Sequence, residues 1–144
     1  MSKRILFVDD EDWSVTPYFP KLQDNKVEVD LARDGDQALE MLRQKKYDLI
    51  VLDIMLPPGN NIGRRVEPRK AGAILLEMIR RSQITNMKTP PDVPIVVLTA
   101  VTDQKLSETI KQLEVAQIFQ KPAPFDEVTE KLLDLLKAER AEMA

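Results

Sequence analysis

Cysteine and histidine are both absent from the 144 residues of this chain. Without cysteine there can be no disulfide and no thiolate nucleophile, and without either residue there is no zinc site of the usual kind. The missing histidine also excludes Ser-His and Cys-His catalytic pairs. Any chemistry must therefore use carboxylates, hydroxyls, amines and metals bound through oxygen.

Long apolar runs and a strong net charge are also missing. No stretch of about 18 apolar residues occurs, and the start MSKRILFVDD has too few apolar residues for a signal peptide. The net charge is −3, with 21 basic and 24 acidic residues, which does not favour direct binding to DNA or to an anionic membrane. We therefore expect a cytoplasmic protein without membrane insertion or direct DNA binding.

The length fits one domain, so we expect a single domain at residues 1–144 without a separate output domain. Within it, five short apolar runs predict strands at 5–8, 27–31, 49–52, 95–98 and 118–119, and the segments between them have helical spacing. Several runs are continuous rather than alternating, as in strands covered on both faces. This pattern predicts an α/β fold with a parallel sheet covered by helices on both faces. The expected type is the flavodoxin-like, doubly wound (βα)5 fold, with its five-stranded parallel sheet taken in the order 2-1-3-4-5.

The first helical segment is expected to be irregular. Pro17 and Pro20 fall inside its span, and proline is tolerated only in the first turn of a helix. We therefore predict a short or irregular helix that ends near Asp24.

Polar residues follow the strands at their carboxyl ends: Asp9 and Asp10 follow the first, Asp53 the third, Thr99 the fourth and Lys121 the fifth. In open α/β sheets, ligands bind outside these ends, where the strand order reverses. The three aspartates are therefore expected to form one acidic cluster, with Thr99 and Lys121 along its rim.

Each residue by itself has a simpler explanation, because Asp9, Asp10 and Thr99 can cap helices, while Asp53 and Lys121 can belong to ordinary turns. Together they indicate a metal site. Three adjacent carboxylates repel one another, and protonation or a hard cation relieves the repulsion. With no histidine available, Mg²⁺ held by two carboxylates, a backbone carbonyl and waters suits these oxygens best.

A carboxylate beside Mg²⁺ can attack a phosphoryl group and form an acyl phosphate. Asp53, on the central strand, is the predicted nucleophile, and Asp9 and Asp10 hold the metal. The Thr99 hydroxyl and the Lys121 ammonium are predicted to bind the phosphoryl oxygens.

Four motifs in this order resemble the receiver domain of two-component response regulators: ILFVDDE, DLIVLDIMLP, PIVVLTA and QKPAPF. The resemblance runs from Lys3 to about Leu136. It implies that a histidine kinase or a histidine phosphotransfer protein supplies the phosphoryl group, in two-component signalling or a phosphorelay. It also implies that phosphorylation switches the binding of a partner, and that the protein is not otherwise an enzyme.

The resemblance further implies a set of metal ligands. Asp10, Asp53 and the Met55 carbonyl would bind Mg²⁺ directly, and Asp9 would act through water. A cis Lys121-Pro122 peptide bond is also implied, and such bonds are rare away from proline.

The fifth strand departs from the family pattern. Ile118 stands where the family has the aromatic residue that takes part in activation, and strand alternation is expected to point Phe119 to the opposite face. The usual aromatic switch is therefore in doubt.

The loop after the third strand also departs from the pattern. The family's glycine at the start of the third helix corresponds to Gly72, so the stretch at about 60–70 is an insertion near the phosphorylation site. A second lengthening, SQITNMKTPPDV, joins the third helix to the fourth strand. The insertion is either a solvated loop, a docking surface for a kinase or an acidic target, or the source of an arginine that reaches the phosphoryl group; its basic residues are Arg64, Arg65, Arg69 and Lys70.

Two other functions remain as alternatives. A receiver-like adaptor would bind partners without phosphorylation, although the full set of site residues argues against it. A Mg²⁺-dependent aspartyl phosphohydrolase would need a second aspartate two residues after the nucleophile as general acid, and Met55 occupies that position.

Overall fold

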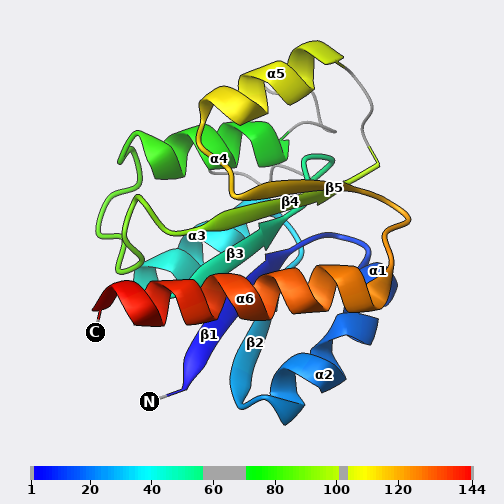
Figure 1. Ribbon diagram of the computed structural model, residues 1–144. Helices are drawn as coiled ribbons and strands as arrows, with labels where there is room; N and C mark the ends of the chain where they lie inside the picture. The colour runs from blue at the N-terminus through cyan, green and yellow to red at the C-terminus, as the bar shows by residue number, and fades with distance from the viewer. Residues whose placement is uncertain (1, 57–70, 101–103, 144) are drawn as a thin grey trace.

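The computed structural model describes residues 2–56, 71–100 and 104–143. Its five parallel strands form one sheet in the order β2-β1-β3-β4-β5, which confirms the predicted fold (Figure 1). The strands are β1 (Lys3–Val8), β2 (Val27–Ala32), β3 (Leu49–Leu52), β4 (Ile95–Thr99) and β5 (Gln117–Gln120). The helices are α1 (Asp12–Val15), the 3-10 helix η1 (Thr16–Tyr18), α2 (Phe19–Asp24), α3 (Gly35–Gln44), α4 (Ala71–Arg80), α5 (Gln104–Gln112) and α6 (Phe125–Met143).

Helices cover both faces of the sheet, which explains why β3 and β4 are buried along their whole lengths. One layer of the core joins the sheet to α3, α4 and α5, and the other joins it to α1, η1, α2 and α6. Ile118 packs in the first layer and Phe119 in the second. The predicted alternation on β5 is therefore confirmed.

The segment after β1 is irregular, as predicted, and it ends at Asp24. Three short helical pieces replace one continuous helix. Pro17 lies at the start of η1 and Pro20 at the start of α2. Each proline occupies a first turn, where its missing N–H costs no helical hydrogen bond.

The lengthened connection between α4 and β4 packs against the end of α3. The Arg43 Nε donates to the Thr85 carbonyl at 2.9 Å. The buried Thr89 hydroxyl donates to the Lys45 carbonyl at 2.8 Å and accepts from the Tyr47 N–H at 3.0 Å. These bonds fix the connection to the fold, so its observed role is structural.

The insertion at 60–70, with Arg64, Arg65, Arg69 and Lys70, lies outside the described residues. Helix α4 begins at Ala71 within the described part of the chain. None of the helices built from described residues has the length and apolar character needed to cross a membrane.

Candidate functional site

The site lies where β1 and β3 end side by side. Val8 of β1 pairs with Leu52 of β3, so Asp9 and Asp53 leave the sheet at the same level. The Asp53 N–H donates to the Val8 carbonyl at 2.9 Å and fixes this alignment. The sheet topology therefore brings together two carboxylates that are 44 positions apart in the sequence.

Asp9, Asp10 and Asp53 form the predicted acidic cluster. One carboxylate oxygen from each residue lies within 4.8 Å of the others. Asp9 and Asp53 are only 2% and 5% exposed, whereas Asp10 faces solvent. The cluster therefore has a buried floor and an open side from which a ligand can enter.

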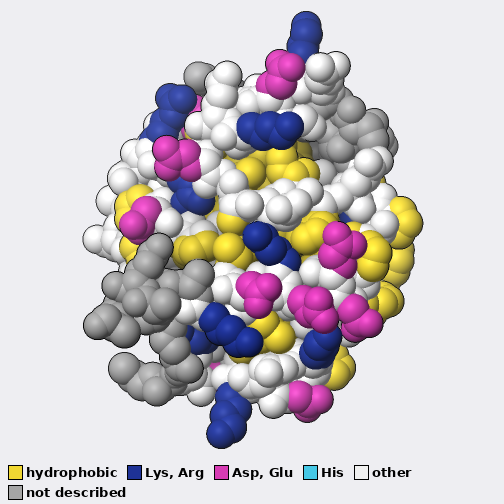
Figure 2. Space-filling model, viewed as in Figure 1, with side chains coloured by type: hydrophobic (Ala, Val, Ile, Leu, Met, Phe, Trp, Pro, Cys, Tyr) yellow, Lys and Arg dark blue, Asp and Glu magenta, His cyan; other side chains and the backbone are white. Residues whose placement is uncertain are grey.

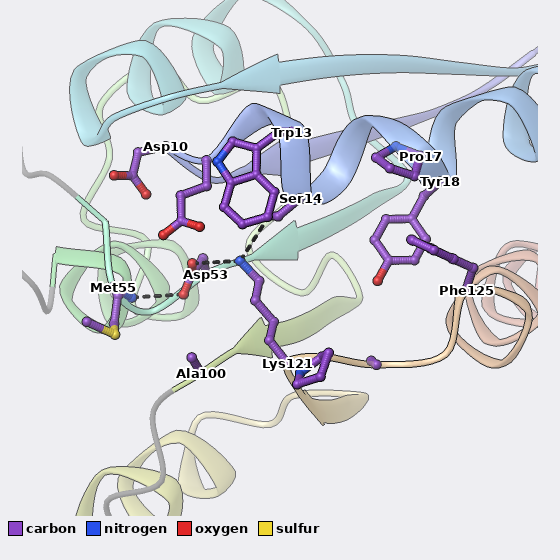
Figure 3. A pocket seen from close by; sticks show the side chains of 13 residues that line it. Asp10, Trp13, Ser14, Pro17, Tyr18, Asp53, Met55, Ala100, Lys121 and Phe125 are labelled. Atoms are coloured by element: carbon purple, nitrogen blue, oxygen red, sulfur yellow. Dashed lines mark hydrogen bonds and ion pairs between the residues drawn. The ribbon is translucent and has the colours of Figure 1, made fainter.

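Lys121 lies inside this cluster rather than along its rim. Its Nζ lies 2.6 Å from Asp9 Oδ2. The same atom lies 3.1 Å from Asp53 Oδ2 (Figure 3). The same ammonium donates to Ser14 Oγ at 3.3 Å. The predicted rim position was wrong, because the ammonium is attracted to both buried carboxylates and the lysine stem is long enough to reach them.

Burial and neighbouring charges act in opposite directions on the pKa values of Asp9 and Lys121. Burial raises the pKa of the Asp9 carboxyl, and the Lys121 ammonium only partly offsets that effect. Burial lowers the pKa of Lys121, but its bonds to Asp9 and the charge of Asp53 outweigh this, so the net pKa is raised. The raised pKa of Lys121 favours its charged form beside the two buried carboxyl groups.

Backbone N–H groups orient the two buried carboxylates. The Glu11 N–H donates to Asp9 Oδ1 at 2.9 Å, and the Met55 N–H donates to Asp53 Oδ1 at 3.0 Å. Each carboxylate thus has one oxygen held by its own loop and the other oxygen near Lys121. This arrangement aims the side chains before any ligand binds.

The remaining predicted residues are close to the cluster, but not all of them line it. Lys121 joins Pro122 through the cis bond that the resemblance implies. The backbone N–H of Lys121 donates to the Thr99 carbonyl at 2.9 Å. Thr99 is buried and lines a different hollow, together with Ile118. Its predicted contact with a phosphoryl oxygen stays a prediction.

A pocket of about 720 Å³ opens from the cluster between α1, η1 and the segment that follows Lys121. Asp10, Asp53 and Lys121 lie at its charged end (Figure 3). The rest is mainly apolar, with Trp13, Pro17, Tyr18, Met55, Ala100, Pro122, Ala123 and Phe125 among the lining residues.

Ser14 and Phe125 also line the pocket, although the sequence did not predict them as site residues. Ser14 lies in the short helix α1, and its hydroxyl lies 3.5 Å from Asp9 Oδ2. Its place just after the Asp9-Asp10 pair was the available signal. Phe125 gives no comparable signal, because its place beside the pocket depends on how α6 packs against η1. Its ring meets the Tyr18 ring edge-on at 5.1 Å.

Gly72 of α4 packs directly on the backbone of the site. Its N–H donates to the Ile54 carbonyl at 3.1 Å. A Cβ atom added at Gly72 would lie 2.6 Å from the Ile54 Cα and 2.9 Å from the Asp53 carbonyl carbon. Only glycine allows α4 to approach so closely the loop that carries Asp53.

We predict that Gly72→Ala destabilises the protein. Alanine normally stabilises a helix by about 1 kcal/mol relative to glycine. Here the added methyl group should instead lower the free energy of unfolding by about 2 kcal/mol, because it would displace the backbone beside Asp53. Urea denaturation followed by circular dichroism measures the change, and a gain in stability would contradict the predicted clash.

The arrangement suits phosphoryl chemistry on a carboxylate. The three aspartates fit a hard divalent cation, because all the donors are carboxylate oxygens that lie close together. Asp53 presents its oxygens towards an open pocket, and the Lys121 ammonium beside it can neutralise charge on an incoming anion.

Comparison with known proteins identifies the family of this chain. Residues 5–133 match the family described as the response regulator receiver domain. The chain is 35% identical over 138 residues to the response regulator MprA of Mycobacterium ulcerans, which covers 96% of this chain and 50% of that protein. It spans about half the length, or less, of the curated relatives that it matches first.

Solved structures give the same answer for the fold. A CheY-like receiver domain protein from Methanospirillum hungatei superimposes with a TM-score of 0.78 at 22% identity, covering 99% of both chains. The receiver domain of the sensor histidine kinase PA1611 from Pseudomonas aeruginosa superimposes with a TM-score of 0.70 at 25% identity, covering 95% of this chain and 99% of that chain. That crystal structure holds a magnesium ion in its active site cleft. By its sequence and its fold, the chain described here belongs to the response regulator receiver domain family of two-component systems.

Proposed function

We propose that this receiver accepts a phosphoryl group on Asp53 from the phosphohistidine of a partner protein. The observation that carries the proposal is the position of Asp53, which is held by the Met55 N–H on one oxygen and lies 3.1 Å from Lys121 Nζ on the other. A carboxylate that these two contacts orient at the end of an open pocket is suited to nucleophilic attack.

In the proposed step, an Asp53 oxygen forms a bond to phosphorus as the phosphorus–nitrogen bond of the donor breaks. The electron pair of that bond passes to the ring nitrogen, and a donor protonated on its other nitrogen leaves as neutral imidazole. Lys121 then has an anionic phosphoryl group to bind in place of a bare carboxylate. The donor ring must come from another molecule, because this chain has no histidine.

Asp10, Asp53 and the Met55 carbonyl are the proposed Mg²⁺ ligands, with Asp9 acting through water. The cation would supply positive charge to the phosphoryl oxygens during transfer. Asp9 and Asp10 then have the task of holding the cation beside Asp53, where their own charges would otherwise repel the donor.

A histidine kinase or histidine phosphotransfer protein is the proposed donor, and a change in partner binding is the proposed output. Several curated relatives are named as transcriptional regulatory proteins. For this chain, the expectations of no direct DNA binding, no other enzymatic activity, a cytoplasmic location and docking by the 60–70 insertion stay predictions.

Trp13 provides a direct test, because it is the only tryptophan and it lines the same pocket as Asp10 and Asp53. We expect Mg²⁺ to change its fluorescence, and acetyl phosphate or beryllofluoride to change it further. Asp10→Asn should weaken the affinity for Mg²⁺, measured by this fluorescence change, about tenfold or more, since a proposed ligand is lost. The proposal would fail if EDTA left the response to acetyl phosphate unchanged.

A further inference from the structure

Two large hydrophobic side chains are exposed among the described residues, and both line the pocket beside Asp53. Trp13 is 70% exposed and Phe125 is 54% exposed. Figure 2 shows hydrophobic side chains gathered at the right-hand edge of the molecule, where α1 and the start of α6 lie in Figure 1. Exposed aromatic rings that share one pocket indicate a binding surface.

Packing against the core explains the position of Phe125 but not that of Trp13. Phe125 meets the Tyr18 ring edge-on, and Tyr18 itself is buried in the core beneath it. Trp13 leaves most of its indole in water, so burial in the core cannot account for its presence. Its flat face is available to a ligand on the wall of the pocket (Figure 3).

The two ends of the pocket suit different parts of one ligand. Asp53 and Lys121 form an end at which a phosphoryl group can react, and the apolar walls around Trp13 suit a flat ring attached to it. Glu11, also in the lining, adds a carboxylate that favours a protonated ring. Tryptophan is the side chain whose face attracts such a cation most strongly.

We propose that Trp13 binds the imidazole ring of the phosphodonor by stacking. The site then prefers a phosphoryl group carried on an aromatic ring to the same group on an aliphatic carrier. This inference rests on the proposed phosphorylation of Asp53, and it adds a residue that selects the donor. Trp13 takes no part in bond making, since the ring leaves with the electron pair of the phosphorus–nitrogen bond as described above.

The test compares two small donors, phosphoimidazole and acetyl phosphate, which carry the same group with and without a ring. The rate of phosphorylation is measured by intact-mass spectrometry at donor concentrations below saturation, with Mg²⁺ present. We expect Trp13→Ala to slow the reaction with phosphoimidazole about threefold to tenfold. With acetyl phosphate the rate should change by less than about twofold, because no stacking is lost.

Trp13→Phe is the matched variant, because it keeps an aromatic face at the same position. It should retain most of the rate with phosphoimidazole. An equal loss with both donors would assign Trp13 a structural role, and no loss with either would remove it from the donor site; both results overturn the inference. Failure of the proposed function itself looks different, because wild-type protein would then accept a phosphoryl group from neither donor.

Discussion

Asp53→Asn is expected to abolish phosphorylation while leaving the fold intact. An amide oxygen is a far weaker nucleophile than a carboxylate, so the rate with a small phosphodonor should fall at least about a thousandfold. The fold should survive, because an asparagine Oδ1 can still accept the Met55 N–H bond that Asp53 Oδ1 now accepts at 3.0 Å. Intact-mass spectrometry after incubation with acetyl phosphate and Mg²⁺ measures the result.

Asp48 offers a matched control at the opposite end of the same strand. Its Oδ2 accepts the Arg4 N–H at 2.9 Å, and it precedes β3 just as Asp53 follows it. Asp48→Asn removes one carboxylate beside the same strand without touching the acidic cluster, so this variant should be phosphorylated like the wild type. Normal phosphorylation of the Asp53 variant would show that another residue is the acceptor.

Arg80→Ala should cause the largest loss of stability of the changes considered. The guanidinium donates to the carbonyls of Leu113, Pro91, Val93 and Glu114, at distances between 2.7 and 3.0 Å. It thereby joins the end of α4 to the turn after α5 and to the segment before β4. Truncation leaves these carbonyls without their charged donor, and we expect the free energy of unfolding to fall by about 3 kcal/mol.

The neighbouring arginine supplies the control for this experiment. Arg81 is 61% exposed and forms a surface pair with Glu77 at 3.3 Å. Arg81→Ala should change the stability by less than about 0.5 kcal/mol. Arg80→Lys should recover only part of the loss, because an ammonium cannot span carbonyls on both sides as the guanidinium fork does. Equal losses of stability for Arg80→Ala and Arg81→Ala in urea denaturation would contradict the stabilising role of the Arg80 hydrogen bonds.

The strands and most of the site were predictable because both depend on local patterns. Continuous apolar runs such as 49–52 identify buried strands, and a polar residue placed just after each run marks its carboxyl end. The strand order then brings Asp9, Asp10 and Asp53 together without further information. Pro17 and Pro20 likewise predict the breaks in the first helical segment, since proline acts on its own backbone.

The position of Lys121 could not be predicted in the same way. Its Nζ meets Asp9 and Asp53 across 112 and 68 positions of sequence. Whether a long side chain stays at the rim or enters the cluster depends on the balance between its desolvation and the attraction of two buried carboxylates. That balance exists only once the sheet has formed.

The sequence by itself determined the strands, the polar residues at their carboxyl ends and the carboxylate expected to react, because strand ends and side-chain types can be recognised along the chain. Only the tertiary structure decided how these residues are held. Three such features arise between segments that are distant in sequence. They are the hydrogen bonds from Arg80 to carbonyls of other segments, the close approach of Gly72 to Asp53, and the pocket shared by Trp13 and Phe125. Their physical basis is packing geometry, which no local pattern of residues specifies.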